Sequence, residues 1–471
     1  MSGTIQLTCL QRVADQLKVP LQGEDAPFQG VSSDSRSVQR GNLFVALNGP
    51  NFDGSRFLQM AQQRGAAGAI VQQHQPIDFP QIVVEDTLQA LGQLAQAWRA
   101  QFVLPLLAIT GSNGKTTVKE MAASILRQLG PGTVTQGNLN NEIGVPLTLL
   151  RITPEDRWAI VEMGASAPGE IARLMVMAQP TAGLVNNAGA AHLGGFGSLQ
   201  QIVEAKGELY AGLGAESSAL INRELPQAEQ WREMAEQSPK SPIVEYGCYS
   251  GSTADLLQGE MRPELPFSLY AQGEQQQITL PLMGQHNRCN AVAAAALAKQ
   301  VGATLPQIKQ GLEQMKAVPG RLQFKTGLMG STLIDDTYNA SPESIRSAIE
   351  VLSRIDGSRL LVLGDMGEMG PEAAQHHHQV GAFAGRAGID QLFALGEQAK
   401  QYVVGFGTGG RHFDLQEQLV EAIKQQLSSD QTLLIKGSRF MKMERVVEAL
   451  LDHTSAVDET VDETVEGEKR P

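Results

Sequence analysis

Residues 110–117 combine glycine, lysine and threonine at a spacing that suits the phosphates of a nucleotide. They are Thr110, Gly111, Ser112, Asn113, Gly114, Lys115, Thr116 and Thr117. An apolar run precedes them and a helical pattern follows, so main-chain N–H groups of the loop and the helix start would point at anionic oxygens. Lys115 would reach the β- and γ-phosphates, and the Thr116 hydroxyl would ligate Mg²⁺. We therefore predict a phosphate site in preference to a glycine turn capped by threonine.

Three other side chains are candidates for a metal site, although their types alone do not decide it. Glu162 directly follows the apolar run WAIV, and a carboxylate at a strand end suits Mg²⁺, the alternative being a solvated charge. A single histidine such as His192 is more often structural, and Mg²⁺ prefers oxygen ligands. Lys206 lies in a helical pattern, where an exposed lysine paired with Glu204 or Glu208 is the plain interpretation.

Strand and helix patterns alternate along the chain and predict an α/β protein of three domains. The first, 1–85, is a small α/β domain. The second, 86–318, has a doubly wound and mostly parallel sheet, and Asp86 is a candidate N-cap of its first helix. The third, 319–454, is a smaller Rossmann-like α/β domain. The acidic segment 455–471 has too few apolar residues to form a core, and we expect it to be a disordered tail.

Individual segments of the two larger domains have clear periods. Apolar residues recur at helical spacing after residue 117 and end before Gly130-Pro131, and an alanine-rich segment at 287–302 also predicts a helix. Short apolar runs predict strands, and they are LLAIT, RWAIVEMGA, TAGLVNN, RLLVLGDM, QLFALG and TLLIKGS.

Composition excludes several classes of protein. A net charge of −13 with no basic stripe argues against a nucleic-acid partner, and no apolar run approaches the roughly 20 residues of a membrane helix. Cys9, Cys248 and Cys289 lack the spacing of metal ligands, which fits a reducing compartment, and we expect a cytoplasmic protein.

The three consecutive histidines at 376–378 cannot share one metal ion, because consecutive helical residues point about 100° apart. At most, His378 packs or contacts nucleotide.

The phosphate loop and a series of further motifs, in order along the chain, are similar to those of the Mur ligase superfamily. The motifs are SSDSRSVQRGNLFVALNGPNFDGSRF, GNLNNEIGVPLTLL, VEMGAS, VNNAGAAHLGGFGS, EAKGELY, GQHNRCNAVAAAALA, PGRLQ, DDTYNASPES, LGDMGEMG and IKGSRF. They span almost the whole chain before the tail. The set most resembles the member that joins D-alanyl-D-alanine to UDP-N-acetylmuramoyl-tripeptide. The resemblance implies two small-molecule substrates, ATP-driven amide formation through an acyl phosphate, and a monomeric enzyme of peptidoglycan synthesis.

The resemblance also implies a site for two Mg²⁺ ions. Glu162 matches a metal ligand of the family, and His192 matches a ligand of the second ion. Lys206 matches a lysine that is carbamylated in most of the family, and the resulting group would help to hold the second Mg²⁺. With Lys115, these three residues are the expected catalytic set, and Thr116 is the fourth expected metal ligand.

Further ATP ligands follow from the matching motifs. From residue types alone, the amides at the start of the alanine-rich helix could read adenine, or Asn287 could be the helix N-cap. The resemblance implies ATP contacts by Asn287 and Asn290. It implies further contacts in the third domain by Arg321, Asp336, Tyr338 and Asn339. Because these residues lie on both sides of the domain boundary, catalysis would require the third domain to close on the second.

The resemblance assigns the remaining candidates to the two substrates. The UDP end is expected to contact Ser33, Asp34, Ser35, Arg36, Asp53 and Gly54. Asn140 and Asn141 match positions near the reacting end of the peptide. Lys436, Ser438 and Arg439, at a strand end in the third domain, are expected to grip the dipeptide carboxylate, although cations after a strand are common on surfaces.

Two alternatives remain open from the sequence. A different ligase of the superfamily is one, but the Asp-Asn-Pro-Arg motif of the diaminopimelate-adding type is absent, and folylpolyglutamate synthase usually lacks the uridine-binding first domain. A regulatory NTP-binding switch is the other, and it would explain the loop without explaining Glu162, His192 and Lys206 as a set.

Overall fold

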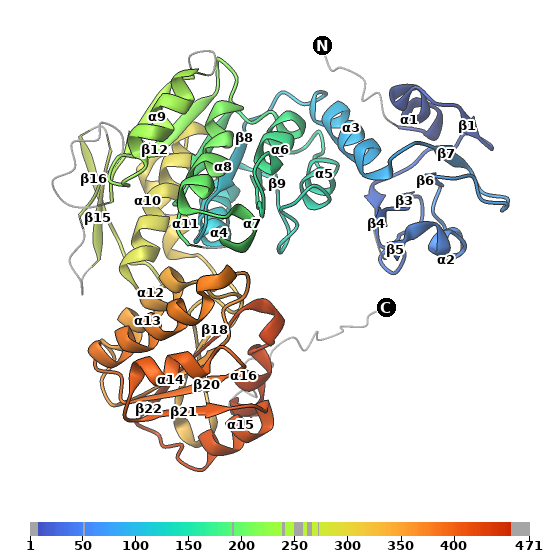
Figure 1. The fold of residues 1–471 in the computed structure, drawn as a ribbon. Coiled ribbons are helices and arrows are strands. Elements are labelled where there is room, and N and C mark those ends of the chain that lie inside the picture. The colour runs from blue at the N-terminus through green and yellow to red at the C-terminus, as the bar shows by residue number, and fades with distance from the viewer. Residues whose placement is uncertain are drawn as a thin grey trace, which may run out of the picture. The chain divides into compact units, whose positions relative to one another are not determined.

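The structure is a computed structural model, and it describes residues 8–49, 52–190, 193–237, 241–248, 258–260, 266–271 and 273–453. The chain forms two compact units, which we call the first and second units (Figure 1). The first unit runs to Lys316 and the second from Ala317, apart from short stretches near 190 and 283 that belong to the second unit. His192 and the tail at 455–471 lie outside the described residues.

The N-terminal part of the first unit contains a five-stranded sheet of order β1-β7-β6-β3-β2, in which only the β1–β7 pair is antiparallel. Its elements are α1 (Leu10–Leu17), β1 (Leu21–Gln22), β2 (Val31–Ser32), β3 (Leu43–Val45), β4 (Asn48–Gly49), β5 (Phe52–Asp53), η1 (Gly54–Phe57), α2 (Leu58–Gln63), β6 (Gly68–Val71) and β7 (Gln81–Val83). Strands β2 and β3 are parallel neighbours. The loops that follow them therefore leave the same edge of the sheet.

Helix α3 (Thr87–Arg99) leads into the central sheet, and its start is the predicted one. The Asp86 carboxylate accepts hydrogen bonds from the Leu88 and Gln89 N–H groups at 2.8 and 3.1 Å, which confirms the N-cap. At the other end of α3, the buried Arg99 donates to the carbonyls of Ala178, Phe102 and Leu104. Both ends of this helix are thus fixed by side-chain hydrogen bonds.

The central sheet has six parallel strands in the order β13-β12-β11-β8-β10-β9, which confirms the doubly wound α/β prediction. Its strands are β8 (Leu106–Thr110), β9 (Gly132–Val134), β10 (Trp158–Glu162), β11 (Ala182–Val185), β12 (Ser218–Asn222) and β13 (Ile243–Tyr246). The chain leaves β8 for β9 and β10 on one side and then returns to β11 on the other. The carboxyl end of β8 is therefore the topological switch point, where ligands of such sheets bind.

Helices and a small antiparallel sheet complete the first unit. The helical elements are α4 (Lys115–Leu126), η2 (Arg127–Leu129), α5 (Gly144–Leu149), α6 (Glu170–Ala178), α7 (Leu193–Phe196), α8 (Leu199–Ala211), α9 (Ala228–Gln237), α10 (Gln285–Gln300) and α11 (Leu305–Glu313). The small sheet consists of β14 (Gln258–Glu260), β15 (Phe267–Ala271) and β16 (Glu274–Ile278). Helix α4 packs against α10 and α11. The helix that follows the phosphate loop is therefore buried on the side formed by the alanine-rich segment.

The second unit has a six-stranded sheet of order β17-β18-β22-β19-β20-β21, parallel except for β17. Its elements are β17 (Gln323–Thr326), η3 (Leu328–Gly330), β18 (Thr332–Asp336), α12 (Pro342–Leu352), β19 (Ser358–Gly364), η4 (Gly370–Glu372), α13 (Ala373–Arg386), β20 (Gln391–Leu395), α14 (Lys400–Phe406), β21 (Gly410–Phe413), α15 (Gln416–Lys424), β22 (Gln431–Lys436), η5 (Arg439–Met441) and α16 (Glu444–Leu450). The strands predicted in RLLVLGDM, QLFALG and TLLIKGS are confirmed as β19, β20 and β22.

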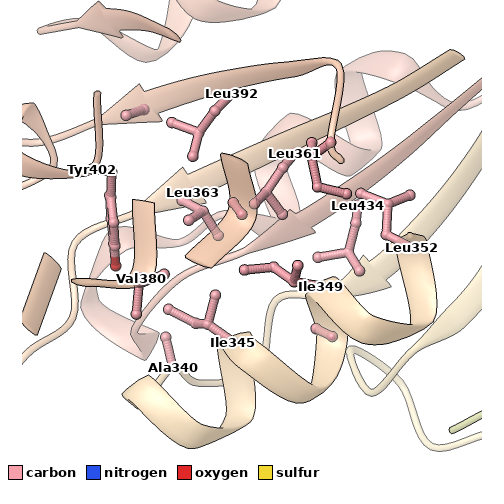
Figure 2. Close-up of a cluster of buried hydrophobic side chains, with 14 of the residues drawn as sticks. Ala340, Ile345, Ile349, Leu352, Leu361, Leu363, Val380, Leu392, Tyr402 and Leu434 are labelled. Atoms are coloured by element: carbon pink, nitrogen blue, oxygen red, sulfur yellow. The ribbon is translucent and has the colours of Figure 1, made fainter. Parts of the chain in front are cut away.

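One face of this sheet carries an apolar core beneath α12, α13 and α14 (Figure 2). Leu361, Leu363 and Leu434 point from the strands towards Ile345 and Ile349 of α12 (Figure 2). A second cluster, which includes Leu360, Leu433 and Val446, fills the opposite face beneath α15 and α16. Because both faces are covered, the strands are continuously apolar, as in other parallel sheets. Among the described residues, no helix is both long and apolar enough to cross a membrane.

The crossing of α13 and α14 yields a stability prediction. A Cβ on Gly381 would collide with the Tyr402 carbonyl, whereas a Cβ on Gly385 in the same helix would lie 3.2 Å from the Phe406 carbonyl. Gly381→Ala should lower the free energy of unfolding by about 1–3 kcal/mol, since a methyl group does not fit there. Gly385→Ala is the matched control. It should change the free energy of unfolding by less than about 1 kcal/mol, because the higher helix propensity of alanine offsets the mild crowding at this position. Urea unfolding checks both, and equal effects would contradict this packing.

Candidate active site

The predicted phosphate loop lies at the switch point of the central sheet. Strand β8 ends at Thr110, α4 begins at Lys115, and β8 lies between β10 and β11. Gly111 and Gly114 have φ angles of +146° and +78°, which other residues rarely adopt. The main-chain N–H groups at the start of α4 are thus directed to the carboxyl edge of the sheet, where an anion would be stabilised.

Several loop side chains hold the loop itself. Thr110 is fully buried and its Oγ1 donates to the Met163 carbonyl at 2.8 Å. The Ser112 hydroxyl contacts the Gly189 carbonyl and N–H, each at 3.0 Å. Thr117 is buried on α4. The Thr110 and Ser112 side chains therefore stabilise the loop itself, as does the Ser112 N–H, which donates to the Asn187 carbonyl at 3.0 Å.

Asparagines that follow β11 support the loop from behind. The Asn113 N–H donates to Asn187 Oδ1 at 2.8 Å, and the Asn113 carbonyl accepts from both Asn186 and Asn187 at 3.0 Å. Asn186 Nδ2 also donates to Asn290 Oδ1 at 2.9 Å. The sequence motifs gave no specific role to Asn186 and Asn187. Two amides directly after an apolar strand could nevertheless have indicated residues that support the loop.

The alanine-rich helix begins earlier than the interpretation of Asn287 as its N-cap requires. Helix α10 begins at Gln285, so Asn287 lies inside its first turn, and the N-cap interpretation is wrong. Asn287 and Asn290 are both buried, and Asn290 Nδ2 donates to Asn287 Oδ1 at 3.2 Å. The two amides therefore adjoin the phosphate loop through Asn186.

Glu162 is the centre of a buried network rather than a solvated charge. Its side chain is 2% exposed and accepts from Thr116 Oγ1 at 2.9 Å and from Asn140 Nδ2 at 2.8 Å. Lys119 Nζ lies 4.0 Å from Glu162 Oε2 and donates to the Thr135 carbonyl at 2.7 Å. Burial of a carboxylate is tolerated because donors and a cation surround it.

The pattern-based prediction did not single out Lys119, which is fully buried one helical turn after Lys115. Its Nζ also lies 3.0 Å from Glu120 Oε1. Asn141 was predicted as a substrate contact, and here its Oδ1 accepts from the Ile143 and Gly144 N–H groups at 3.1 and 3.0 Å, which stabilises the turn that leads into α5. A lysine in a helical pattern gives no sign of being buried, so only the packing of α4 identifies Lys119.

Lys115 and Lys206 lie near one another beside the loop. Lys115 Nζ donates to the Gly111 carbonyl at 2.7 Å and so lies over the loop. Lys206 on α8 is 2% exposed, which makes the exposed-lysine interpretation wrong, and its Nζ lies 5.5 Å from the Phe196 ring centroid. Burial, followed by repulsion from Lys115, lowers the pKa of Lys206 to about 7. Lys206 is therefore largely neutral above that pH.

The donor set fits Mg²⁺ in part. Thr116 Oγ1 and Glu162 offer hard oxygen ligands, and they lie close enough for one ion to contact both. Within the described ranges, no group of three His, Cys, Asp or Glu side chains could hold a metal. His192 lies outside these ranges, and Lys206 would have to gain a carboxylate before it could act as a ligand.

The residues predicted for the UDP end follow β2 and β3, two parallel neighbours. Asp34 and Arg36 form an exposed ion pair, with Nη2 2.8 Å from Oδ2, while Ser35 is buried and Ser33 half-buried. Asp53 Oδ1 accepts from Ser55 and caps η1. A Cβ on Gly54 would lie 2.5 Å from the Leu47 carbonyl oxygen, so this position requires glycine. The two loops leave the same edge of the sheet, but no described contact joins them.

The second unit brings its predicted nucleotide residues together. The Arg321 guanidinium lies 4.3 Å from the centroid of the Tyr338 ring. Asp336 Oδ1 accepts from the Leu322 N–H at 3.2 Å, and Lys436 Nζ lies 2.6 Å from Asp336 Oδ2. Burial raises the pKa of Asp336, although Lys436 and Arg321 partly offset the effect. The segments around 321 and 337 therefore form one polar cluster.

Ser438 and Arg439, the residues predicted with Lys436 to bind the dipeptide, directly follow β22. Ser438 Oγ accepts from the Gly367 N–H at 2.8 Å. The largely exposed Arg439 lies 2.9 Å from Glu444 Oε1.

Of the three consecutive histidines at 376–378, His377 is buried. Its Nε2 accepts from the Met366 N–H at 3.0 Å, and its Nδ1 contacts the Ala373 carbonyl. His378 is exposed and does not pack, so of the two alternatives given for it only the nucleotide contact stays a prediction.

Family models match most of the chain. The Mur ligase middle domain matches residues 109–298, the Mur ligase glutamate ligase domain matches 320–439, and the Mur ligase family catalytic domain matches 27–99. A relative from Escherichia coli (strain K12), named UDP-N-acetylmuramoyl-tripeptide--D-alanyl-D-alanine ligase, is 42% identical over 446 residues, which is 94% of this chain and 98% of the relative. The chain belongs to the Mur ligase family.

Solved structures give the same result. A crystal structure of MurF from Acinetobacter baumannii has a TM-score of 0.86 and 34% identity, and covers 93% of this chain and 97% of that one. MurF ligase from Thermotoga maritima in complex with ADP has a TM-score of 0.78 and 26% identity, with coverage of 89% and 96%. These similarities confirm the predicted fold class, whereas the predicted domain boundaries and individual site residues stay predictions.

The loop geometry yields a binding prediction. A Cβ on Gly114 would lie 2.5 Å from Asn186 Nδ2 and 2.6 Å from Asn290 Oδ1. Gly114→Ala should therefore displace the loop and weaken ATP binding by about tenfold or more, equivalent to ~1.4 kcal/mol. Gly273 has a similar φ of +82°, but a Cβ added there would meet no atom within 4 Å, so Gly273→Ala controls for backbone strain alone. Isothermal titration with ATP compares them, and equal affinities would contradict the assignment.

Proposed function

We propose that this protein joins D-alanyl-D-alanine to UDP-N-acetylmuramoyl-tripeptide in an ATP-dependent reaction that yields the pentapeptide precursor of peptidoglycan. The observation that carries the proposal is the near full-length similarity to a relative named for this reaction. A phosphate loop at the switch point and the buried contact between Thr116 and Glu162 support it independently of that name.

The proposed reaction has two steps. A terminal carboxylate oxygen of the tripeptide attacks the γ-phosphorus of ATP, and the bond from that phosphorus to the β-γ bridging oxygen breaks to release ADP. The dipeptide amine then attacks the acyl-phosphate carbonyl, the amide C–N bond forms, and inorganic phosphate leaves as the amine loses a proton. Both steps need positioning and neutralisation of phosphate charge more than covalent help from the protein.

The first unit would carry the phosphate chemistry. The N–H groups at the start of α4 would bind the β- and γ-phosphates, Lys115 would turn from Gly111 O towards them, and Asn287 and Asn290 would contact the base. Thr116 and Glu162 would hold one Mg²⁺, and His192 with carbamylated Lys206 would help to hold a second. Such ions would neutralise phosphate charge. The pKa of Lys206 and its burial suit carbamylation, which requires a neutral amine.

The remaining assignments complete the proposal. Arg321, Asp336, Tyr338 and Asn339 would contact ATP, while Ser438 and Arg439 would receive the dipeptide carboxylate. Residues 33–36 with Asp53 and Gly54 would bind the UDP end, and Asn140 and Asn141 would lie near the reacting peptide end. We also propose a cytoplasmic monomer with the three domains and acidic tail that the sequence predicts.

Substrate dependence tests the function directly. Purified protein with ATP and Mg²⁺ should release phosphate only when UDP-N-acetylmuramoyl-tripeptide and D-alanyl-D-alanine are both present, and mass spectrometry should find the pentapeptide product. Lysine and diaminopimelate forms of the tripeptide are tried separately. Release with another amino acid in place of the dipeptide would indicate a different Mur-type ligase. Hydrolysis indifferent to both substrates would indicate an NTP-driven switch and would overturn the proposal.

The proposed metal ligand Thr116 can be tested with a nearly isosteric change. Thr116→Val removes the hydroxyl that meets Glu162, so the Mg²⁺ concentration for half-maximal phosphate release should rise by about tenfold, the equivalent of ~1.4 kcal/mol of lost coordination. Thr148→Val is the control, because this buried hydroxyl bonds to Gly144 O within α5. If both variants keep the wild-type Mg²⁺ dependence, Thr116 does not ligate the ion.

Carbamylation of Lys206 should depend on pH in a defined direction. Because the pKa of Lys206 is lowered to about 7, the reactive neutral amine predominates above pH 7 and is lost as the pH falls below it. With ¹³C-bicarbonate, a carbamate carbon signal should be present at pH 8, weaken at pH 6 and be missing in Lys206→Met. An ordinary exposed lysine, with a pKa near 10.4, would remain almost wholly charged at both pH values. A signal unchanged in Lys206→Met would place the carbamate elsewhere.

A further inference from the structure

Lys436, the last residue of β22, has surroundings unlike those of a substrate-binding cation. Its side chain is 4% exposed. Its Nζ donates to Asp336 Oδ2 at 2.6 Å and to the Asn339 carbonyl at 2.8 Å, and it lies 3.4 Å from the Asp336 carbonyl. A lysine ammonium has three N–H donors and no acceptor. The three protein oxygens therefore match the full donor capacity of Lys436.

The partner of Lys436 is fixed by strand register. Strands β18 and β22 are parallel neighbours, and Asp336 lies opposite Lys436 at the carboxyl end of the pair. Side chains at paired positions point to the same face of a sheet, so the register alone places the Asp336 carboxylate beside the Lys436 ammonium. Asp336 is held on its other oxygen by the Leu322 N–H. The carboxylate is thus immobilised from both sides.

Lys436 also fixes the turn that follows Asp336. Its bond to the Asn339 carbonyl joins β22 to the end of that turn, just before the Ser341 N-cap of α12. Within the same turn, the Tyr338 N–H donates to the Gly320 carbonyl at 3.1 Å, and the Tyr338 ring lies beneath Arg321. One buried ammonium therefore braces the segment that carries three of the proposed ATP ligands.

We propose that Lys436 is a positioning residue for the nucleotide, which fixes Asp336 and the turn at 336–339, and that it does not bind the dipeptide carboxylate. This inference rests on the proposed function and replaces the expectation that Lys436 grips the dipeptide. Loss of one partner of a buried pair leaves an uncompensated charge, which then pulls water or other donors towards it. Displacement of Asp336 and the turn would weaken ATP binding while leaving Ser438 and Arg439 in place.

Steady-state kinetics with each substrate varied in turn separates the two roles. Lys436→Met should raise the KM for ATP by about tenfold or more, equivalent to ~1.4 kcal/mol, with less than about threefold change in the KM for D-alanyl-D-alanine. Arg439→Ala should show the reverse pattern. A merely structural role would lower the amount of folded enzyme, and hence the apparent kcat, without changing one KM selectively.

Lys325→Met is the matched control. Lys325 Nζ lies 2.6 Å from Asp335 Oδ2, so this variant removes an ion pair of equal length from the residue adjacent to Asp336. Lys325 has no role in the proposed chemistry and is partly exposed, so water can take the place of its ammonium, while Asp335 keeps its bonds to Thr337 through the other oxygen. Both KM values should therefore stay within about twofold of wild type, less than ~0.5 kcal/mol. A selective change in the KM for ATP here would mean that any ion pair near β18 has this effect, and would overturn the assignment to Lys436.

Lys436→Arg provides a second, independent test if Lys436→Met does not fold. A guanidinium binds a substrate carboxylate at least as well as an ammonium, so a dipeptide-binding Lys436 would tolerate this change. A positioning Lys436 would not, because the larger group displaces Asp336, and the KM for ATP should rise. A raised KM for the dipeptide with an unchanged KM for ATP, in either variant, overturns the inference. Wild-type enzyme that does not require the dipeptide would instead refute the proposed function.

Discussion

The architecture of the candidate site depends on one buried carboxylate, that of Glu162. It ends β10, accepts from Thr116 of α4 and Asn140 of the loop after β9, and lies 4.0 Å from the buried ammonium of Lys119. A buried charge without such partners would cost several kcal/mol. Helix α4, strand β10 and the loop after β9 are therefore fixed relative to one another, and Thr116 and Glu162 both adjoin the phosphate loop.

The same constraint operates in the second unit, on a different pair. Asp336 and Lys436 end two adjacent parallel strands, and their ion pair holds the turn that carries Tyr338 and Asn339. In both units, polar groups gather at the carboxyl edge of the sheet because its parallel strands all end there. Apolar strands and covering helices then exclude water on both faces, which makes each ion pair and hydrogen bond at the edge stronger and each unpaired charge more costly.

Pattern and propensity predicted the elements that have a local cause. The Asp86 N-cap, the helix after the phosphate loop, the alanine-rich helix and the strands of the second unit were all confirmed, because caps and apolar periods act over a few residues. Predictions that depended on which face of an element is covered did less well. The exposed-lysine interpretation of Lys206 and the N-cap interpretation of Asn287 are both wrong. His378, which was expected at most to pack or to contact nucleotide, does not pack.

The sequence by itself determined the α/β class, the phosphate loop between strand and helix, and the family to which the chain belongs, because these are encoded in short contiguous motifs. Only the tertiary structure decided which polar groups meet. Lys119 and Glu162 are 43 residues apart in number, and Lys436 and Asp336 are separated by 100. Packing of α4 against β10 brings the first pair together, the register of β18 and β22 brings the second together, and no local pattern specifies either one. The low pKa of Lys206 has the same origin, since it requires burial and a second lysine that arrives from another helix.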